Sequence, residues 1–244
     1  VEPRNAPTVV NAIFNHRNFW DGRANNTYNG VSPWGDRDPD AGVWVKTGAR
    51  SAAKQKLRLE NASLASLAMG PALSDVEMSC VARKWPNIGR KLLLRQPLQG
   101  QKVHHQDSVL GALSLSTPGS LKPGLNTTYK NMIMGAFNPK FWSFSSTGPF
   151  GAPAGQEPYN QMEANFSMFF GIALQLYQGT LVSDQAPIDL TPRDPITHLP
   201  TWEGMGKTQA EIDSLNNGLA TFTNNHCNLC HSGPALTTAA ITLN

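Results

Sequence analysis

The segment Cys227-Asn228-Leu229-Cys230-His231 restricts what this chain can fold into more than any other feature of its sequence. Two thiols three positions apart, followed at once by an imidazole, form the pattern by which c-type haem is attached to proteins. On a helical turn this offset matches the separation of the two porphyrin vinyl groups to which the thiols add, and His231 can then reach the iron. We therefore interpret Cys227 and Cys230 as the covalent attachment points of a haem and His231 as its proximal iron ligand.

The other ring nitrogen of His231 is expected to donate to a backbone carbonyl, which would hold the ring and tune its basicity. A redox dithiol or half of a zinc site is the alternative interpretation. Zinc would need a second ligand pair, and the remaining cysteine, Cys80, is expected to be a small buried apolar residue. No Met or His follows His231. The sixth iron ligand is therefore expected from an upstream residue or from sequence beyond Asn244.

The composition is that of a globular protein, because 40% of the 244 residues are hydrophobic and 15% are charged. No stretch reaches the roughly 18 consecutive apolar residues that a transmembrane helix needs, so no membrane span is expected. The 20 basic residues are scattered along the chain, which argues against nucleic-acid binding. Three cysteines are too few for a disulfide framework.

Glycine and proline number 21 and 18, and they cluster in segments 29–42, 117–124 and 147–158, which predicts long ordered loops between short helices. Strict alternation of polar and apolar residues is scarce, whereas three- and four-residue spacing recurs. A mostly α fold with little β structure is therefore expected.

Three helices are predicted. The first begins at Ser74, where Ser-Asp-Val-Glu has the spacing of a capping box, and runs to about Trp85, where Pro86 ends it. The second covers 160–177, and the third opens with the capping box Thr208 to Glu211 and leads to Cys227. The second helix is predicted to be part of the core, with one broad face made of Met162, Phe166, Phe169, Phe170, Ala173, Leu174 and Tyr177. The third places Ile212, Leu215, Leu219 and Phe222 at three- and four-residue steps.

Four blocks, in order along the chain, resemble the bacterial di-haem cytochrome c peroxidase and MauG superfamily. They are Asn5-Ala-Pro-Thr-Val-Val-Asn11, Phe19-Trp-Asp-Gly-Arg-Ala24, Gly70-Pro71 with Val76-Glu-Met78, and the haem motif followed by Ser-Gly-Pro. The resemblance implies cytochrome-c-like haem domains of mostly α structure with long ordered loops. It also implies a peroxide-reacting haem in the N-terminal domain and an electron-entry haem in the C-terminal one.

The resemblance predicts two parts in this chain. Residues 1–195 would form the inter-haem and distal-side region of an N-terminal haem domain that is largely absent, and 196–244 would begin the C-terminal cytochrome-c domain. The family's first Cys-X-X-Cys-His lies upstream of the Asn-Ala-Pro block. One haem c is therefore expected on this chain and a second on a segment before Val1, with a ligand-bearing segment after Asn244.

The resemblance also suggests catalytic residues. Glu77 matches the acid above the open haem that helps to cleave the O–O bond by proton transfer, although it could instead cap its helix with Ser74. The amide that accompanies this acid in peroxidases falls at Leu67, which cannot do polar chemistry. Trp20 matches the tryptophan between the two haems, where a large π system shortens the tunnelling distance, although a core position would also suit a tryptophan.

Further binding residues follow from the same resemblance. Arg23 could pair with a haem propionate or be a solvated surface residue, and Asn5 matches a ligand of an interdomain calcium ion. The long insertion between Ala24 and Gly70, with Trp34 among its aromatic residues, resembles the larger branch that includes the di-haem rubber oxygenases. The stretch 165–184 also resembles that branch, and an apolar aromatic pocket near Trp34 would favour an oxygenase.

The resemblance implies reduction of hydrogen peroxide, a small-molecule oxidant, by electrons that enter through the haem on Cys227 and Cys230. A small redox protein such as a cytochrome or cupredoxin would donate them. One alternative is a haem dioxygenase of the rubber-cleaving type, and another is a non-enzymatic electron-transfer cytochrome. Attachment of c-type haem outside the cytoplasm predicts a periplasmic or secreted bacterial protein, and the resemblance is compatible with a homodimer.

Overall fold

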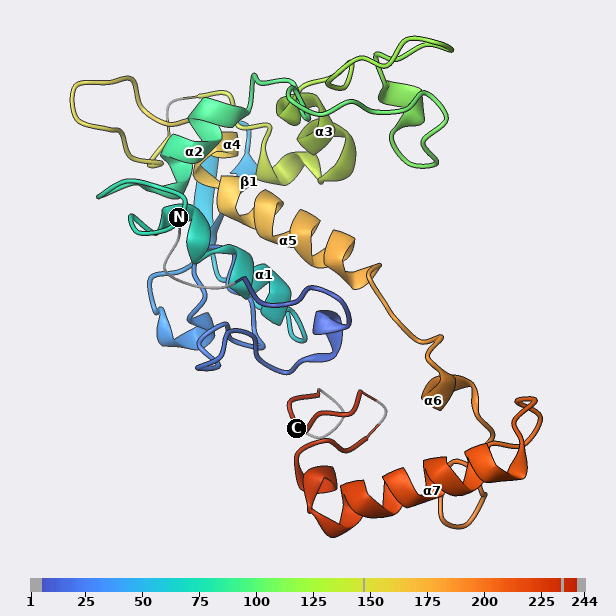
Figure 1. Ribbon diagram of the computed structural model, residues 1–244. Coiled ribbons are helices and arrows are strands. Elements are labelled where there is room, and N and C mark those ends of the chain that lie inside the picture. Colours follow the sequence, from blue (N-terminus) through green and yellow to red (C-terminus); the bar gives the residue numbers. More distant parts are fainter. Residues whose placement is uncertain (1–5, 147, 234, 241–244) are drawn as a thin grey trace.

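The computed structural model describes residues 6–146, 148–233 and 235–240 and confirms the mostly α fold expected from the sequence (Figure 1). A main body holds a small sheet and several helices, and an extended segment after it leads to a projecting C-terminal lobe. The helices are α1 (Ser63–Ala68), α2 (Trp85–Leu92), α3 (Tyr129–Ala136), α4 (Gln161–Ala164), α5 (Phe166–Gly179), α6 (Pro187–Leu190) and α7 (Gln209–Asn224), and the strands are β1 (Val43–Gly48) and β2 (Ser51–Gln55).

The two strands form an antiparallel hairpin within the insertion that follows Ala24. Val43 pairs with Gln55 and Val45 pairs with Ala53, and the register shifts between Lys46 and Gly48. Val43 and Val45 are buried, whereas β2 is mostly exposed. The insertion therefore supplies part of the main hydrophobic core through β1.

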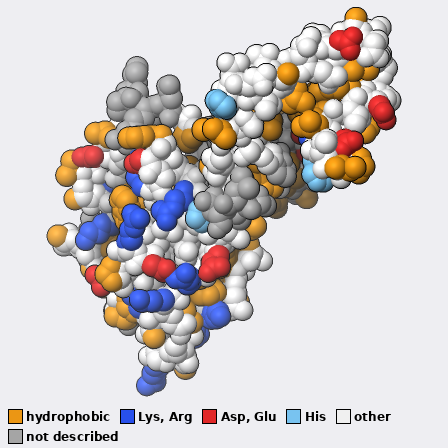
Figure 2. Space-filling model, turned by 90° about the horizontal axis from the view of Figure 1, so that it is seen from below, with side chains coloured by type: hydrophobic (Ala, Val, Ile, Leu, Met, Phe, Trp, Pro, Cys, Tyr) orange, Lys and Arg blue, Asp and Glu red, His pale blue; other side chains and the backbone are white. Residues whose placement is uncertain are grey.

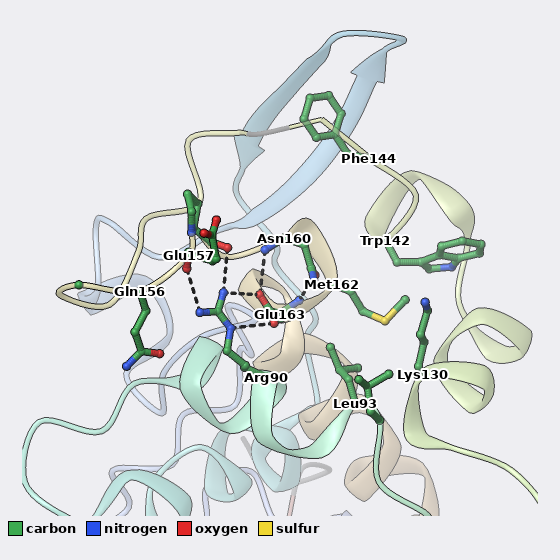
Figure 3. A pocket seen from close by; sticks show the side chains of 13 residues that line it. Arg90, Leu93, Lys130, Trp142, Phe144, Gln156, Glu157, Asn160, Met162 and Glu163 are labelled. Carbon is green, nitrogen blue, oxygen red and sulfur yellow. Dashed lines mark hydrogen bonds and ion pairs between the residues drawn. The ribbon is translucent and has the colours of Figure 1, made fainter.

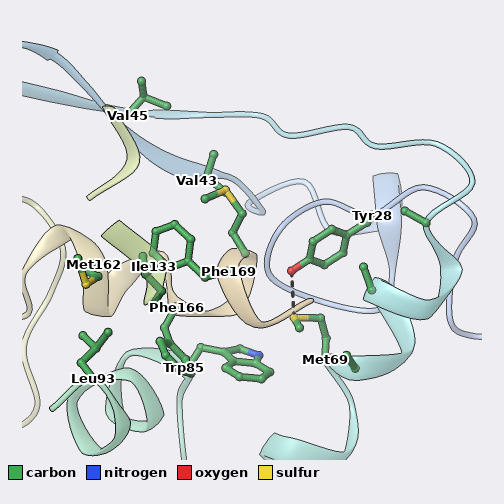
Figure 4. Close-up of a cluster of buried hydrophobic side chains, with 14 residues drawn as sticks. Tyr28, Val43, Val45, Met69, Trp85, Leu93, Ile133, Met162, Phe166 and Phe169 are labelled. Carbon is green, nitrogen blue, oxygen red and sulfur yellow. Dashed lines mark hydrogen bonds between the residues drawn. The ribbon is translucent and has the colours of Figure 1, made fainter. Parts of the chain in front are cut away.

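The main core is centred on α5, where Phe166, Met168 and Phe169 are almost completely buried (Figure 4). The buried face predicted for 160–177 is confirmed for this first half of α5. It is wrong for Ala173 and Tyr177, which are exposed, because the helix runs out of the main body towards the C-terminal lobe.

Tyr28 lies across α5 in the centre of this core and is fully buried. Its hydroxyl donates to the carbonyl of Ser167 at 2.8 Å, and burial raises its pKa well above the usual value. The close approach requires a glycine, because a Cβ at Gly171 would lie 2.5 Å from the Tyr28 oxygen. Tyr28 thus anchors the insertion to α5.

The helix predicted from Ser74 to Trp85 is wrong. Residues 74–84 form turns, with Ala82 at a φ of 62°, and α2 begins at Trp85, the residue where the predicted helix was to end. Pro86 lies in the first turn of α2, where its fixed φ suits a helix and its missing N–H needs no partner. Proline here starts a helix, and Cys80, predicted to be buried, is exposed in the turns before it.

The capping box predicted for the last long helix is confirmed. Thr208 Oγ1 accepts from the Glu211 backbone N–H, and the Glu211 carboxylate accepts from the Thr208 N–H at 2.7 Å. The apolar face of α7 is only half-buried. Trp202 packs beside the helix and its indole N–H donates to Asn216 at 3.2 Å. No helix among the described residues is both long and apolar enough to cross a lipid bilayer.

Two buried amides join β1, the segment 140–144 and the start of α5. The Asn165 side chain accepts from the Trp44 N–H at 2.7 Å and donates to the carbonyls of Trp44 and Phe141. The Gln161 side chain donates to the carbonyls of Trp44 and Lys140 and accepts from the Phe144 N–H. Asn165 also separates α4 from α5. The single helix predicted for 160–177 is therefore interrupted at Asn165, the residue whose side chain bonds to Trp44 of β1.

Replacing Asn165 by leucine should destabilise the protein, because the part-buried Trp44 N–H and Phe141 carbonyl lose their partner. We expect Asn165→Leu to lower the free energy of unfolding by about 3 kcal/mol, as measured by chemical denaturation. The matched control is Asn131→Leu, an exposed position on α3, which should change it by less than about 0.5 kcal/mol. Equal stabilities of the two variants would show that the amide bonds contribute nothing net.

Candidate haem site and the segments around it

The Cys-X-X-Cys-His segment forms one helical turn after α7. A 3₁₀ helix covers Cys227–Leu229, and His226 before it has a left-handed φ of 60°. The carbonyl of Cys227 accepts from the N–H groups of Cys230 at 3.2 Å and His231 at 2.9 Å. Both cysteines are free and exposed, so both thiols are accessible to a reacting group.

The ring of His231 is held by the chain itself. Its Nδ1 lies 3.1 Å from the carbonyl oxygen of Leu236, and its ring centroid lies 6.2 Å from that of Phe222 on α7. With Nδ1 donating to this carbonyl, the tautomer leaves Nε2 with a lone pair for a metal. The sequence analysis expected such a contact between a backbone carbonyl and the ring nitrogen that does not bind the iron.

The surroundings of the motif suit an apolar macrocycle. Exposed hydrophobic side chains gather on the projecting C-terminal lobe (Figure 2), among them Ile196, Leu229 and Leu236. Two accessible thiols and an oriented imidazole are the donor set of a c-type haem. A zinc site lacks support, because no group of three or more His, Cys, Asp or Glu side chains suited to a metal occurs in the described part of the chain.

Trp20 lies at the tip of a small hairpin and is 90% exposed. Asn18 and Ala24 close the hairpin through two backbone hydrogen bonds of 3.2 Å. Phe19, beside Trp20, has a φ of 64° and packs against Gly70, where an added Cβ would lie 3.4 Å from the Phe19 ring. The alternative of a core position for Trp20 is therefore wrong, and two of the family-like blocks meet at this hairpin.

Arg23, on the same hairpin, is partnered within the chain. Its guanidinium lies 2.8 Å from the Asp21 carboxylate and 4.0 Å from the centroid of the Phe19 ring. The hydrogen bond from Arg23 is the main reason that the pKa of Asp21 is lowered. Arg23 is therefore not a freely solvated residue, and its pairing with a haem propionate stays a prediction.

The hairpin is linked to the chain that follows the haem motif. The N–H of His16 donates to the carbonyl of Ala239 at 2.7 Å, and Asn15 and Ala240 form an isolated antiparallel bridge. The Asn18 side chain donates to Ser63 at 2.7 Å, and Ser63 donates to the Asn15 carbonyl at 2.8 Å. A short, hydrogen-bonded path thus connects the Trp20 hairpin to the C-terminal lobe.

Glu77 lies half-buried in the turns that precede α2. Its N–H donates to the Ser74 carbonyl at 3.3 Å, as does that of Ser79 at 2.8 Å. Because no helix begins at Ser74, the alternative role of Glu77 as a helix cap is wrong. Leu67, the residue in the place of the family's amide, is half-buried on α1.

The remaining predicted binding residues are less informative. Trp34 is 44% exposed at the start of the 3₁₀ helix Gly35–Arg37, and it does not line the cavity described in the next paragraph. Trp44, another tryptophan of the insertion, contacts the ring of Phe150 at a centroid distance of 5.3 Å. Asn5, the predicted calcium ligand, lies outside the described residues.

A cavity of about 940 Å³ lies between α2, α4 and the loop before α4 (Figure 3). Arg90 forms a bidentate ion pair with Glu163 at 2.9 Å and also donates to the carbonyls of Glu157 and Pro158. The hydrogen bond to Glu163 is the main cause that raises the pKa of Arg90. The sequence analysis did not predict this ion pair. The capping box formed by Asn160 and Glu163 is its one local signal in the sequence. Arg90 and Glu163 neutralise each other within the cavity.

Comparison with known proteins identifies the larger part of the chain. Residues 1–194 match the family model described as di-haem cytochrome c peroxidase. The matched region ends before α7, so the haem motif lies beyond it. No curated protein and no solved structure matches the chain.

Removing both thiols of the motif should remove one covalently bound haem. We expect Cys227→Ser with Cys230→Ser to lower the covalent haem content of the full-length protein by one per chain, measured by intact mass and by haemochrome absorbance. Cys80→Ser, which changes the third exposed cysteine, should leave the haem content unchanged. An unaltered haem mass in the double variant would contradict attachment at this motif.

Proposed function

The chain belongs to the di-haem cytochrome c peroxidase and MauG family, and from that membership we propose that it reduces hydrogen peroxide to water. In this reaction one peroxide takes up two electrons and two protons, its O–O bond breaks, and two water molecules form. The electrons would come from a small redox protein such as a cytochrome or cupredoxin.

The anchored ring of His231 is the observation that carries this proposal. Its Nδ1 contact with the Leu236 carbonyl leaves Nε2 as the metal-binding nitrogen, next to two accessible thiols. A c-type haem bound to Cys227 and Cys230 would supply a one-electron redox centre there. Such a centre suits entry of electrons at the C-terminal lobe.

Trp20 is proposed to carry electrons between this lobe and the main body. The support is its place on a hairpin whose preceding residues, Asn15 and His16, pair with the chain just after the haem motif. A tryptophan that is 90% exposed has little packing role in the chain described. Its indole is therefore available to contact a group or segment that bridges the two parts.

Glu77 is proposed to move the proton during O–O cleavage. The support is its match to the family's acid together with the absence of a capping role, since the chain at Ser74 forms turns. A carboxylate in this role would take a proton from one peroxide oxygen and deliver it to the other. The leucine at position 67 means that an amide partner for this transfer would have to come from elsewhere.

A second candidate function is oxygenase cleavage of an apolar substrate. It is favoured by the insertion after Ala24, which is folded into the core through Tyr28 and β1. In either case covalent haem attachment places the protein in the periplasm or outside the cell, and this location is part of the proposal.

Changing Glu77 to glutamine should separate the proposed proton transfer from a structural role. The substitution keeps the shape of the side chain but removes its acid, so we expect peroxide turnover to fall by about 10²–10⁴-fold with little change in Tm. Asp75→Asn, an exposed acid two residues away, is the matched control and should retain turnover. Steady-state kinetics with a reduced donor protein measures both.

Two results would oppose this assignment. Full peroxide turnover in Glu77→Gln would exclude the acid role. A wild-type protein without peroxide turnover that cleaves a polyisoprene with uptake of dioxygen would replace the peroxidase by the oxygenase.

The role of Trp20 can be tested without loss of protein stability. Because its side chain is exposed, Trp20→Leu should change the free energy of unfolding by less than about 0.5 kcal/mol. We expect kcat to fall by about tenfold, equal to about 1.4 kcal/mol in activation free energy, and Trp20→Phe to restore part of it. Wild-type turnover in Trp20→Leu would be incompatible with a role in electron passage.

A further inference from the structure

One short stretch of chain, residues 11–16, joins the main body to the C-terminal lobe. It bonds to the linker that leaves α5 and again to the chain that follows the haem motif. In the described part of the chain, this stretch makes every hydrogen bond between the main body (6–180) and residues 183–240. The position of the projecting lobe (Figure 1) therefore depends on few polar contacts.

Asn11 makes the connection to the linker through three hydrogen bonds. Its backbone N–H donates to the carbonyl of Leu181 at 2.9 Å. Its side-chain Nδ2 donates to the carbonyl of Ser183 at 3.0 Å, and its Oδ1 accepts from the N–H of Ser183 at 2.7 Å. One amide thus satisfies both backbone groups of a residue that belongs to no helix or strand. The direction in which the chain leaves α5 is therefore fixed at Ser183.

The main body holds Asn11 in place before it reaches the linker. Asn11 has a φ of 60°, in the left-handed region that asparagine adopts more readily than most residues with a side chain. The 3₁₀ helix Ala12–Phe14 follows it and packs against α5. An added Cβ at Gly179 would lie 3.6 Å from the Ile13 side chain. The amide of Asn11 is therefore presented to the linker from a packed element.

The other connection lies at the far end of the lobe, where the N–H of His16 donates to the Ala239 carbonyl at 2.7 Å. The chain between the two connections, residues 183–239, contains α6, α7 and the haem motif. Both ends of this segment are therefore fastened to one stretch of the main body. A segment tethered at both ends has fewer orientations open to it than a lobe that hangs on a single linker.

The two connections also hold the parts of the proposed electron path. The Trp20 hairpin is closed by Asn18, which lies directly after residues 11–16. The ring of His231 contacts the carbonyl of Leu236, just before the chain returns to the main body. Electron transfer slows steeply as the distance between redox groups grows. A contact that fixes the lobe therefore also fixes the rate at which electrons leave it.

We propose that Asn11 is a positioning residue, because its side chain fastens the linker at Ser183. Together with the contact of His16 with Ala239, it holds the haem motif at a fixed distance from the Trp20 hairpin. The proposal rests on the proposed function, which gives this fixed distance its use. Asn11 itself contacts neither peroxide nor a haem in this role.

The test is Asn11→Gly in the full-length holoprotein. Glycine keeps the left-handed backbone and its bond to Leu181, but both side-chain bonds to Ser183 are lost. We expect the Ser183 amide to exchange with solvent about tenfold faster, measured by hydrogen exchange. Electron transfer between the haems, followed by stopped-flow absorbance, should slow by about tenfold. The Tm, the midpoint potentials and the KM for the donor should not change.

The matched control is Asn61→Gly, at another left-handed asparagine, with a φ of 54°. Asn61 is exposed on the main body and its side chain bonds to no described residue, so both rates should stay at the wild-type values. A second variant, Ser183→Pro, removes the N–H that Asn11 accepts. It lies at an exposed linker position outside the core and should slow the transfer between the haems in the same way.

Transfer at the wild-type rate in both Asn11→Gly and Ser183→Pro would overturn the positioning role, as would an equal loss in Asn61→Gly. Unchanged exchange of the Ser183 amide in Asn11→Gly would show that the side chain does not fasten the linker. The transfer between the haems is started by reduction and needs no peroxide. Failure of the proposed function is therefore distinguishable, because it would appear as absent peroxide turnover in the wild type.

Discussion

The main body depends on two buried amides, Gln161 and Asn165, that bond to backbone instead of to other side chains. They satisfy the polar groups of Trp44 and of the segment 140–144. A two-stranded hairpin has little stability of its own, and unpaired backbone groups cannot be buried without cost. The two amides bond to the backbone N–H and carbonyl of Trp44 as a neighbouring strand would, so β1 can lie against α5 within the core.

The position of α5 in turn determines where the candidate functional residues lie. Its buried half holds Tyr28 and the insertion, while Gln175 accepts from the Ala65 N–H at 2.9 Å and so holds α1. Ser63 at the start of α1 bonds to Asn15 and Asn18, which places the Trp20 hairpin beside the chain that returns from the haem motif. Packing of one helix therefore links the core to the proposed electron path.

Pro86 explains why the helix predicted from Ser74 to Trp85 differs from the structure. Pro86 is compatible both with the end of a helix and with its first turn, and the local sequence does not distinguish them. The structure places Trp85 in the core against Phe170, so α2 starts there and the turns that carry Glu77 and Cys80 remain outside it.

The sequence alone determined the haem motif, the mostly α character and the capping box of α7, because each depends on residues within a few positions of one another. It also carried the first three family blocks, which lie within the match over residues 1–194. Tertiary structure decided the rest. The exposure of Trp20, the Asp21 partner of Arg23, the contact of His231 with Leu236 and the meeting of Asn15 with Ala240 depend on how the chain turns and on which distant segments it brings together. Periodicity and spacing describe one element at a time, whereas these contacts arise only when packed elements compete for the same buried space.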